Sequence, residues 1–463
     1  MLFSSVSFLY MFLPTVIFAC FIGKSRLWRN TVLLIFSLYF YSWGEPKQLI
    51  LLIGTSLLAY FCGIGMAKYA NRKKGIFILA VALLTGSLIF FKYLGFICRC
   101  FPAFRNAQIA LPDIALPLGI SFYIFQIMSY LIDLYRGNIT AEKNFFLFLL
   151  YISFFPQLIM GPIVRYGTVC EELRNRNENW DDAIYGSRRF ITGLAKKVLL
   201  ANNMALISDT IYNASAGAGT CALWLAAVCY TLEIYFDFSG YSDMAIGLGR
   251  IFGFHFPENF HYPYVSQSIS EFWRRWHISL SSWFRDYIYI PLGGNRVSLC
   301  RSIVNILAVW GLTGMWHGAS WNFLLWGIIN GVLLIGEKFL FKNALNRLPE
   351  LLRHIYALFF ITISWTVFHF EDFSVLGTVL KDMFLFRPTD WVSLLMIDTS
   401  ICLKLLMIIP ACIFAFPVLK KAGLPDETPV KACAVNLLYL ALLAISIMFI
   451  ISSSYNPFIY FNF

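Results

Sequence analysis

Two histidines, His277 and His317, are the side chains best placed to do chemistry in an otherwise apolar chain. His317 lies in the segment Met315-Trp316-His317-Gly318, at the end of a long apolar stretch. A neutral imidazole there can accept a proton from a hydroxyl group, and the neighbouring glycine can leave room for a substrate. Because ionisable side chains are costly inside a membrane, those that occur there often have a function. His317 is therefore either a general base or a histidine that only hydrogen-bonds a helix backbone.

His277 closes the run Glu271-Phe272-Trp273-Arg274-Arg275-Trp276-His277, which combines an acid, two arginines and two indoles. It either orients a substrate or caps a helix, and its spacing alone favours the cap. The region holds four arginines: Arg274, Arg275, Arg285 and Arg296. Guanidinium groups bind phosphates bidentately, so these arginines are candidates for holding a phosphate-bearing donor molecule. Anchoring to lipid headgroups explains each of them equally well.

Three carboxylates, Glu233, Asp237 and Asp243, precede this run within a long apolar segment. Acids at membrane depth need partners, and the basic groups nearest in sequence are Arg250 and the arginines of the following loop. We therefore predict that Asp237 and Asp243 contribute to the same pocket as Trp276.

Motifs for bound metals and nucleotides are missing from the sequence. It has no glycine-rich nucleotide loop, no paired Cys–Cys metal motif and no Gly-x-Ser-x-Gly nucleophile elbow. The 11 cysteines are scattered. We therefore predict no metal site and no tightly bound cofactor.

The elements that must position these residues are membrane helices. Of the 463 residues, 59% are hydrophobic and 13% are charged, and the mean hydropathy is +0.69. A soluble domain carries roughly 25% charged residues. Repeated apolar windows of about 20 residues can each cross a hydrocarbon core of about 30 Å. The composition therefore predicts an all-α polytopic membrane protein that forms one integral domain, residues 1–463.

Hydropathy predicts about 11–12 transmembrane helices. The expected spans are residues 1–22, 30–43, 48–67, 76–97, 114–135, 198–213, 221–250, 302–317, 319–341, 354–370, 398–419 and 432–453. The apolar segment 144–160 is broken by Pro156, Gln157, Gly161 and Pro162 and is followed by a strongly basic loop, so we predict a re-entrant or interfacial element there. Residues 257–301 are too polar for a span and rich in aromatics, which predicts helices that lie in the interface or dip inward to form a pocket.

The net charge of +11 follows from the distribution of basic residues between the loops. With twelve spans and the N-terminus outside, most of the 36 Lys and Arg residues fall in inner loops. This positive-inside pattern predicts a multi-pass membrane protein with both termini outside. It also removes the need for a nucleic-acid partner to explain the charge.

Three stretches resemble the membrane-bound O-acyltransferase family, in the bacterial branch of alginate O-acetyltransferases and their peptidoglycan and exopolysaccharide relatives. The stretches are Tyr235 to Ala245, Glu271 to Arg296 and Trp316 to Asn322. The first residues, the segment Gly161 to Tyr166 and the closing Pro457 to Phe463 also look like that branch. The resemblance covers nearly the whole chain.

This resemblance implies a ring of transmembrane helices around a central tunnel, with a catalytic core at about 235–322. In the family, the histidine that matches His317 is catalytic and the one that matches His277 supports it. The donor implied is acetyl-CoA or another cytosolic acyl carrier, and a periplasmic or extracellular serine-hydrolase-like partner completes the transfer. The resemblance also implies a location in the bacterial inner membrane, where lipids surround the protein.

The C-terminal aromatic tail, residues 456–463, carries a further implied role. Tyr460 matches a tyrosine that is thought to relay the acyl group in related systems. A phenol has a pKa of about 10 and would need a base such as His317 to attack a thioester. The alternative is that Tyr460 only anchors the tail at the membrane interface.

The resulting hypothesis is an O-acyltransferase that acetylates a cell-surface polysaccharide, such as alginate, peptidoglycan or another exopolysaccharide. Two alternatives remain: an enzyme that transfers D-alanine or a longer acyl chain, and a transporter of a polysaccharide or lipid intermediate. Transporters often contain inverted repeats with paired broken helices, and the polar residues here crowd into one segment without a matching half.

Overall fold

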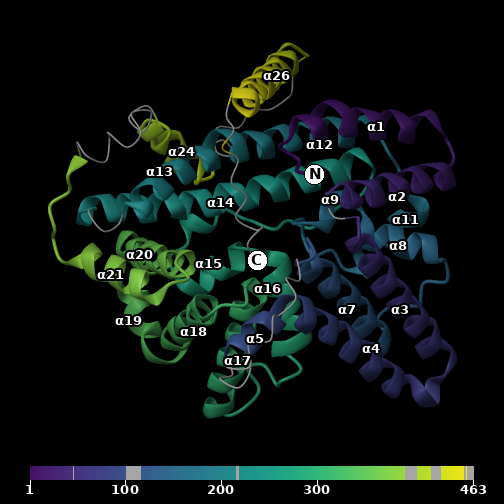
Figure 1. Cartoon of the computed structure of the whole chain (residues 1–463), viewed down its shortest axis with the longest axis horizontal. Helices are drawn as coiled ribbons and strands as arrows, with labels where there is room; N and C mark the ends of the chain where they lie inside the picture. The colour runs from purple at the N-terminus through teal and green to yellow at the C-terminus, as the bar shows by residue number, and fades with distance from the viewer. Residues whose placement is uncertain are drawn as a thin grey trace. The chain divides into compact units, whose positions relative to one another are not determined.

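The structure is a computed structural model that describes residues 1–44, 46–100, 116–214, 218–391, 404–418, 429–452 and 455 (Figure 1). These residues form helices and turns and contain no β-strand. Eight helices in this part of the chain are long and apolar enough to cross a membrane. They are Gln48–Lys68, Ala70–Cys100, Trp180–Asn213, Thr220–Ile251, Leu299–His317, Trp321–Leu340, Glu350–His369 and Lys431–Ser452. The prediction of an all-α polytopic membrane protein is confirmed; the full count of spans, the ring and the tunnel stay predictions.

Several expected spans correspond to helices that are shorter than a full membrane crossing. Helix α2 (Arg26–Ser42) and helix α7 (Ile120–Arg136) have 17 residues each, and Phe8–Ile22 is a shorter apolar helix. The expected span 398–419 lies partly outside the described residues, which include helix α24 (Ile408–Phe414). At a rise of 1.5 Å per residue, 17 residues cover about 25 Å, slightly less than a hydrocarbon core.

The segment expected to be re-entrant is broken. Helix α8 (Phe145–Ser153) ends before Phe154, and helix α9 (Phe155–Leu158) begins with a proline in its first turn. Proline is tolerated there because the first amide groups of a helix have no intrahelical acceptor. Neither helix is long enough to cross a membrane alone.

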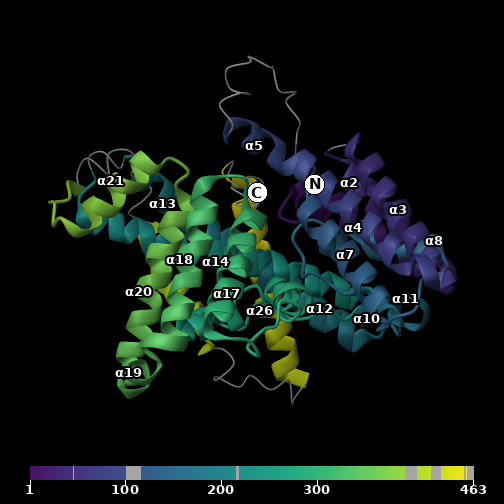
Figure 2. The same ribbon diagram turned by 90° about the horizontal axis from the view of Figure 1, so that it is seen from below.

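The described chain divides into two compact units, residues 1–190 with 242–257 and residues 191–241 with 258–463. In the first unit, α3 (Gln48–Lys68), α4 (Lys73–Leu88) and α7 pack on one another, and α2 packs on α8. In the second, α18 (Trp321–Ile335) packs between α17 (Leu299–His317) and α20 (Glu350–His369). Figure 2 shows α18 and α20 running side by side.

Two glycines allow α17 and α18 to approach closely. A Cβ atom on Gly314 would collide with the backbone oxygen of Phe323, and one on Gly327 would collide with that of Trp310. Small residues at such crossings let membrane helices pack through their backbones. This contact fixes the end of α17, where His317 is located, against the first turns of α18.

The loop between α14 (Thr220–Ile251) and α17 folds into short helices. These are α15 (Ile269–Arg275), α16 (Ile278–Phe284) and the π-helix η6 (Arg285–Tyr289). A seven-residue helix is only about 10 Å long, so none of them can span a bilayer. The prediction that this region does not form a span is confirmed.

Candidate active site

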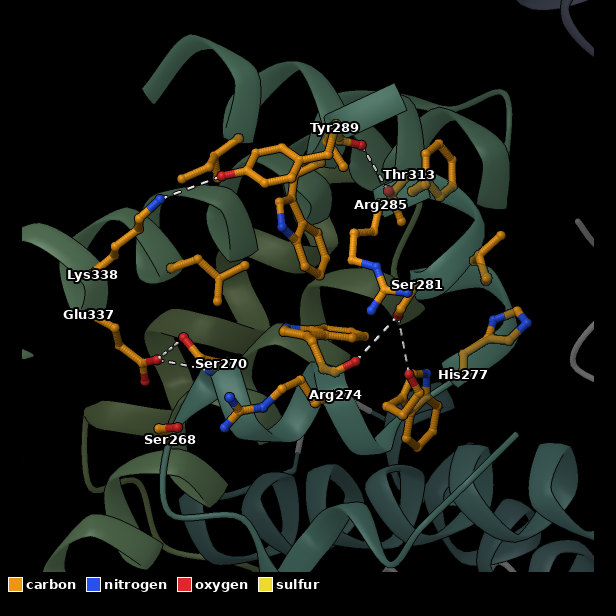
Figure 3. A pocket seen from close by; sticks show the side chains of 18 of the residues that line it. Ser268, Ser270, Arg274, His277, Ser281, Arg285, Tyr289, Thr313, Glu337 and Lys338 are labelled. Atoms are coloured by element: carbon orange, nitrogen blue, oxygen red, sulfur yellow. Dashed lines mark hydrogen bonds between the residues drawn. The ribbon is translucent and has the colours of Figure 1, made fainter. Parts of the chain in front are cut away.

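Both candidate histidines line one cavity of about 740 Å³ within the second unit (Figure 3). Its walls come from α15, α16, η6, α17 and α18, together with the π-helix η7 (Gly336–Leu340) and α19 (Lys342–Arg347). The α17 wall consists of Ile306, Val309, Trp310, Thr313 and His317. This spacing places the side chains on one face of the helix, and the eleven steps from Ile306 to His317 extend about 16 Å. The cavity is therefore elongated along α17.

The two ends of the cavity differ in polarity. Lys338 lies beside the start of α17, because its Nζ donates to Ser302 Oγ at 3.2 Å and to Asn295 Oδ1 at 2.5 Å. Lys342 and Asn346 also line the cavity, and they follow Lys338 along the chain. His317 is the last residue of α17 and lies at the opposite end. The cavity thus runs from a basic end, formed by Lys338 and Lys342 and called the basic mouth below, to the buried imidazole of His317.

Aromatic side chains surround His317, which is only 4% exposed. The centroid of its ring lies 5.0 Å from those of Trp316 and Trp326 and 5.3 Å from that of Phe368, all at nearly perpendicular angles. Trp365 stacks behind Trp326 at 5.8 Å. An imidazole in such a setting is shielded from water, which strengthens its interactions with any polar group that reaches it.

The space beside Gly318 differs from our expectation. We expected this glycine to leave room for a substrate, but a Cβ atom there would collide with the ring of Phe323. The glycine instead allows Phe323 to pack against the end of α17. Substrate must therefore reach His317 from the cavity side.

His277 separates α15 from α16 in a left-handed backbone conformation, with φ 44° and ψ 55°. Its ring contacts Phe238 at 4.6 Å and Trp316 at 5.8 Å between centroids, so Trp316 touches both histidines. Burial lowers the pKa of His277 to about 3. The side chain is therefore neutral at physiological pH and can act only as a neutral imidazole.

Arg274 and Arg285 line the cavity, whereas Arg275 does not. Arg274 forms no hydrogen bond or ion pair with the described residues, so its guanidinium group is available to a ligand. Arg285 pairs with Asp286 at 2.7 Å and remains largely exposed. Arg275 instead binds Glu271 at 2.8 Å and the backbone oxygen of His261 at 3.1 Å. Of the predicted pocket residues, Trp276 also lines the cavity.

The two predicted pocket aspartates have other partners. Asp237 forms an ion pair with Lys197 at 2.5 Å, and both side chains are buried. Asp243 belongs to the first unit, where Arg189 binds it at 2.7 Å. Arg250, which we expected to bind one of them, binds Asp182 at 2.7 Å. The basic partners come from the preceding helical segment, not from Arg250 or the loop that follows.

Glu337 supports the cavity wall and was not identified from the sequence. Its buried carboxylate accepts hydrogen bonds from the backbone amides of Ile269 at 2.6 Å and Ser270 at 2.8 Å, and from Ser270 Oγ at 2.6 Å (Figure 3). A carboxylate at a helix N-terminus binds unpaired amide groups and complements the helix dipole. Glu337 thereby fixes α15, the helix that ends with Arg274 and Arg275.

Asn330 also supports the cavity wall, because it binds the indole ring of Trp273, which lines the cavity. It accepts a hydrogen bond from Trp273 Nε1 at 3.1 Å and donates to Ser364 Oγ at 2.8 Å. Trp273 packs edge to face against Trp310 at 4.8 Å. No local motif distinguishes Asn330 or Glu337, because Trp273, Ser364 and Ile269, which they bind, lie more than 30 residues away from them in the chain. Tyr460, the candidate relay residue, lies outside the described residues.

A polytopic helical protein with a buried, histidine-lined cavity behind a basic mouth has the architecture of an integral-membrane acyltransferase. Residues 35–380 match the membrane-bound O-acyltransferase family, and the chain belongs to it. The resemblance inferred from the three motifs is confirmed, and the protein is an O-acyltransferase.

Individual relatives cover most or all of the chain. The chain is 36% identical to the probable alginate O-acetylase of Pseudomonas putida, over 100% of both proteins. It is 39% identical to that of Pseudomonas aeruginosa, over 83% of this chain and 75% of the relative. It is 31% identical to the peptidoglycan O-acetyltransferase of Helicobacter pylori, over 100% of this chain and 98% of the relative.

Proposed function

We propose that this enzyme transfers an acetyl group from a thioester donor, acetyl-CoA or an acyl carrier, for O-acetylation of a cell-surface polysaccharide. The observation that carries the proposal is a cavity that is lined by Lys338 and Lys342 as well as by His317. A phosphate-bearing donor has its anionic groups at one end and its thioester at the other. The names of the relatives, alginate and peptidoglycan O-acetylases, support acetyl as the group and a polysaccharide as the destination.

His317 acts as the general base in this proposal. Its imidazole removes the proton from the acceptor hydroxyl while the oxygen attacks the thioester carbonyl carbon. The carbon–sulfur bond then breaks, and the imidazolium returns the proton to the departing thiolate, which leaves as a thiol. His277 stays neutral and contributes to the wall of the cavity.

The acceptor and the cellular setting are further parts of the proposal. The acceptor hydroxyl belongs either to Tyr460, which would carry the acetyl group onward, or directly to an outer molecule. A serine-hydrolase-like protein outside the bacterial cell membrane would complete the transfer to the polymer. The positive-inside pattern supports a cytosolic donor side and an orientation with both termini outside.

The aromatic walls favour a small acyl group. Trp316, Trp326 and Phe368 pack around the imidazole of His317 at ordinary ring-contact distances. Extra methylene groups in a close-packed interior force neighbouring side chains to move, which commonly costs about 1–3 kcal/mol. We therefore favour acetyl over D-alanyl or a longer chain. Family membership argues against the transporter alternative.

The test is transfer of radiolabelled acetyl from acetyl-CoA by the purified enzyme in proteoliposomes, with mass spectrometry of the C-terminal peptide. We expect label to leave the donor, and acetyl-CoA to be used faster than butyryl- or hexanoyl-CoA. Faster use of the long-chain donors would contradict the acetyl assignment, and no transfer from any thioester would contradict the whole proposal. Normal transfer by a Tyr460→Phe variant would exclude the tyrosine relay but leave the enzyme assignment intact.

Arg274 and Arg275 form a matched pair for testing the donor end. Replacing Arg274 by glutamine should raise the KM for acetyl-CoA about tenfold or more, because a charge-assisted hydrogen bond contributes about 1.5–3 kcal/mol. Arg275→Gln removes the same charge one residue away, from a side chain directed toward Glu271. Its KM should stay within about twofold of wild type, since Arg275 does not line the cavity. Equal effects of the two variants would show that Arg274 acts only through general charge.

A further inference from the structure

Three arginines converge on one carboxylate at the α1–α2 turn of the first unit. Helix α1 (Leu13–Ile22) ends just before Gly23, and α2 begins at Arg26. Arg26 and Arg29 both bind Glu178, Arg29 at 2.8 Å, and Arg176 Nε lies 3.1 Å from the same carboxylate. Three guanidinium groups against one carboxylate leave a surplus of two positive charges.

The guanidinium groups also have unused donors. Three arginines carry about fifteen N–H groups. Their hydrogen bonds to the described residues are eight: three from Arg26, two from Arg29 and three from Arg176. Arg176 has a fully buried side chain, and its Nη2 atom has no hydrogen-bond partner among the described residues. The side chains of Arg26 and Arg29 are 28% and 18% exposed, so a ligand at the surface can reach their unused N–H groups.

The neighbouring acids have hydrogen-bond partners outside the cluster. Glu172, whose backbone oxygen accepts from Arg176, directs its carboxylate to His255 Nδ1 at 2.7 Å. Asp182 pairs with Arg250. The hydrogen-bond partners that position Arg176 are otherwise neutral, namely Asn30 Oδ1 at 2.6 Å and the backbone oxygen of Phe252 at 2.8 Å.

The surface beside the arginines is apolar and exposed. Phe18 is 70% exposed and Leu27 is 77% exposed, and Trp28 and Phe21 are exposed as well. Arg29 lies over the Phe21 ring at 5.2 Å. Apolar side chains next to arginines at the end of a hydrophobic helix match the two parts of a phospholipid, the acyl chains and the anionic headgroup.

We propose that the Arg26–Arg29–Arg176 cluster binds the phosphate of an anionic phospholipid, whose acyl chains lie along Phe18, Phe21 and Leu27. This lipid would accept hydrogen bonds from Arg26 and Arg29, while the buried charge of Arg176 adds to the attraction, and it would stabilise the α1–α2 turn against the segment 172–178. The site is separate from the cavity and independent of the acyl-transfer proposal, because its residues belong to the first unit.

Lipid titrations of the detergent-solubilised full chain test the proposal. Dioleoyl phosphatidylglycerol should raise the midpoint of thermal unfolding more than dioleoyl phosphatidylcholine, which has the same acyl chains and no net charge. The double variant Arg26→Gln/Arg29→Gln should need much more phosphatidylglycerol for half-maximal stabilisation. The expected change is about fivefold per arginine, and so about 25-fold for both.

Controls separate the cluster from general surface charge. Arg72→Gln/Lys74→Gln removes the same charge from exposed side chains near the start of α4 and should behave like wild type. If the cluster variant folds poorly, Arg29→Gln alone retains the Arg26–Glu178 ion pair and should still lose about fivefold. An equal loss in the α4 variant would overturn the proposal. Stabilisation by inorganic phosphate alone, to the same extent, would overturn the lipid as the ligand.

Discussion

Replacing His317 by glutamine should lower the rate of acyl transfer by about 10²–10⁴-fold, because the reaction would lose its general base. His317 lines the cavity and is enclosed by Trp316, Trp326 and Phe368. Among the described histidines, only His277 also lines the cavity. Glutamine keeps most of the side-chain volume and can still form hydrogen bonds. The loss should therefore appear in kcat, with little change in the KM for acetyl-CoA or in the midpoint of thermal unfolding.

His369→Gln is the matched control. His369 also ends a membrane-length helix and packs against aromatic rings, Tyr212 and Tyr230, each at 4.7 Å between centroids. It does not line the cavity. Its substitution should leave kcat within about threefold of wild type, since substitutions away from the reacting groups act mainly on stability. A His317 variant as active as the His369 variant would rule out His317 as the base.

Breaking the buried ion pair between Lys197 and Asp237 should strongly destabilise the protein. Removing one member of such a pair leaves an uncompensated buried charge, which commonly costs about 3–5 kcal/mol. Lys197→Met should therefore lower the midpoint of thermal unfolding in detergent markedly. The double variant Lys197→Met/Asp237→Leu should recover most of the loss, because neither charge then remains buried.

The more exposed ion pair between Glu271 and Arg275 provides the comparison for this prediction. Glu271 and Arg275 are bound at 2.8 Å, but their side chains are about one quarter exposed. Exposed pairs contribute about 0–1 kcal/mol, so Arg275→Gln should barely shift the midpoint. If Lys197→Met shifted the midpoint of thermal unfolding no more than Arg275→Gln, the ion pair between Lys197 and Asp237 would not be important for the stability of the protein. Asp237 would then again be a candidate for a direct role in the pocket.

The contrast between these two pairs shows where sequence-based reasoning stops. Asp237 was predicted to be a pocket residue with an arginine from the next loop as partner, and Arg275 was grouped with Arg274. The structure places Asp237 against Lys197, forty residues earlier in the chain, and directs Arg275 away from the cavity that Arg274 lines. Adjacent residues on a helix point in different directions, so neighbours in sequence need not share a site.

The sequence by itself determined the helical membrane class, the region that cannot span, the family and the two histidines as the main candidates. These properties follow from apolarity summed over about 20 residues and from short motifs, and both are local in the chain. Only the tertiary structure decided which side chains line the cavity and which acids are neutralised elsewhere. It also revealed Glu337 and Asn330 as supports of the cavity wall. Those outcomes depend on side-chain direction and on close packing between distant segments, where a hydrogen bond or a glycine contact is made only after the helices have assembled.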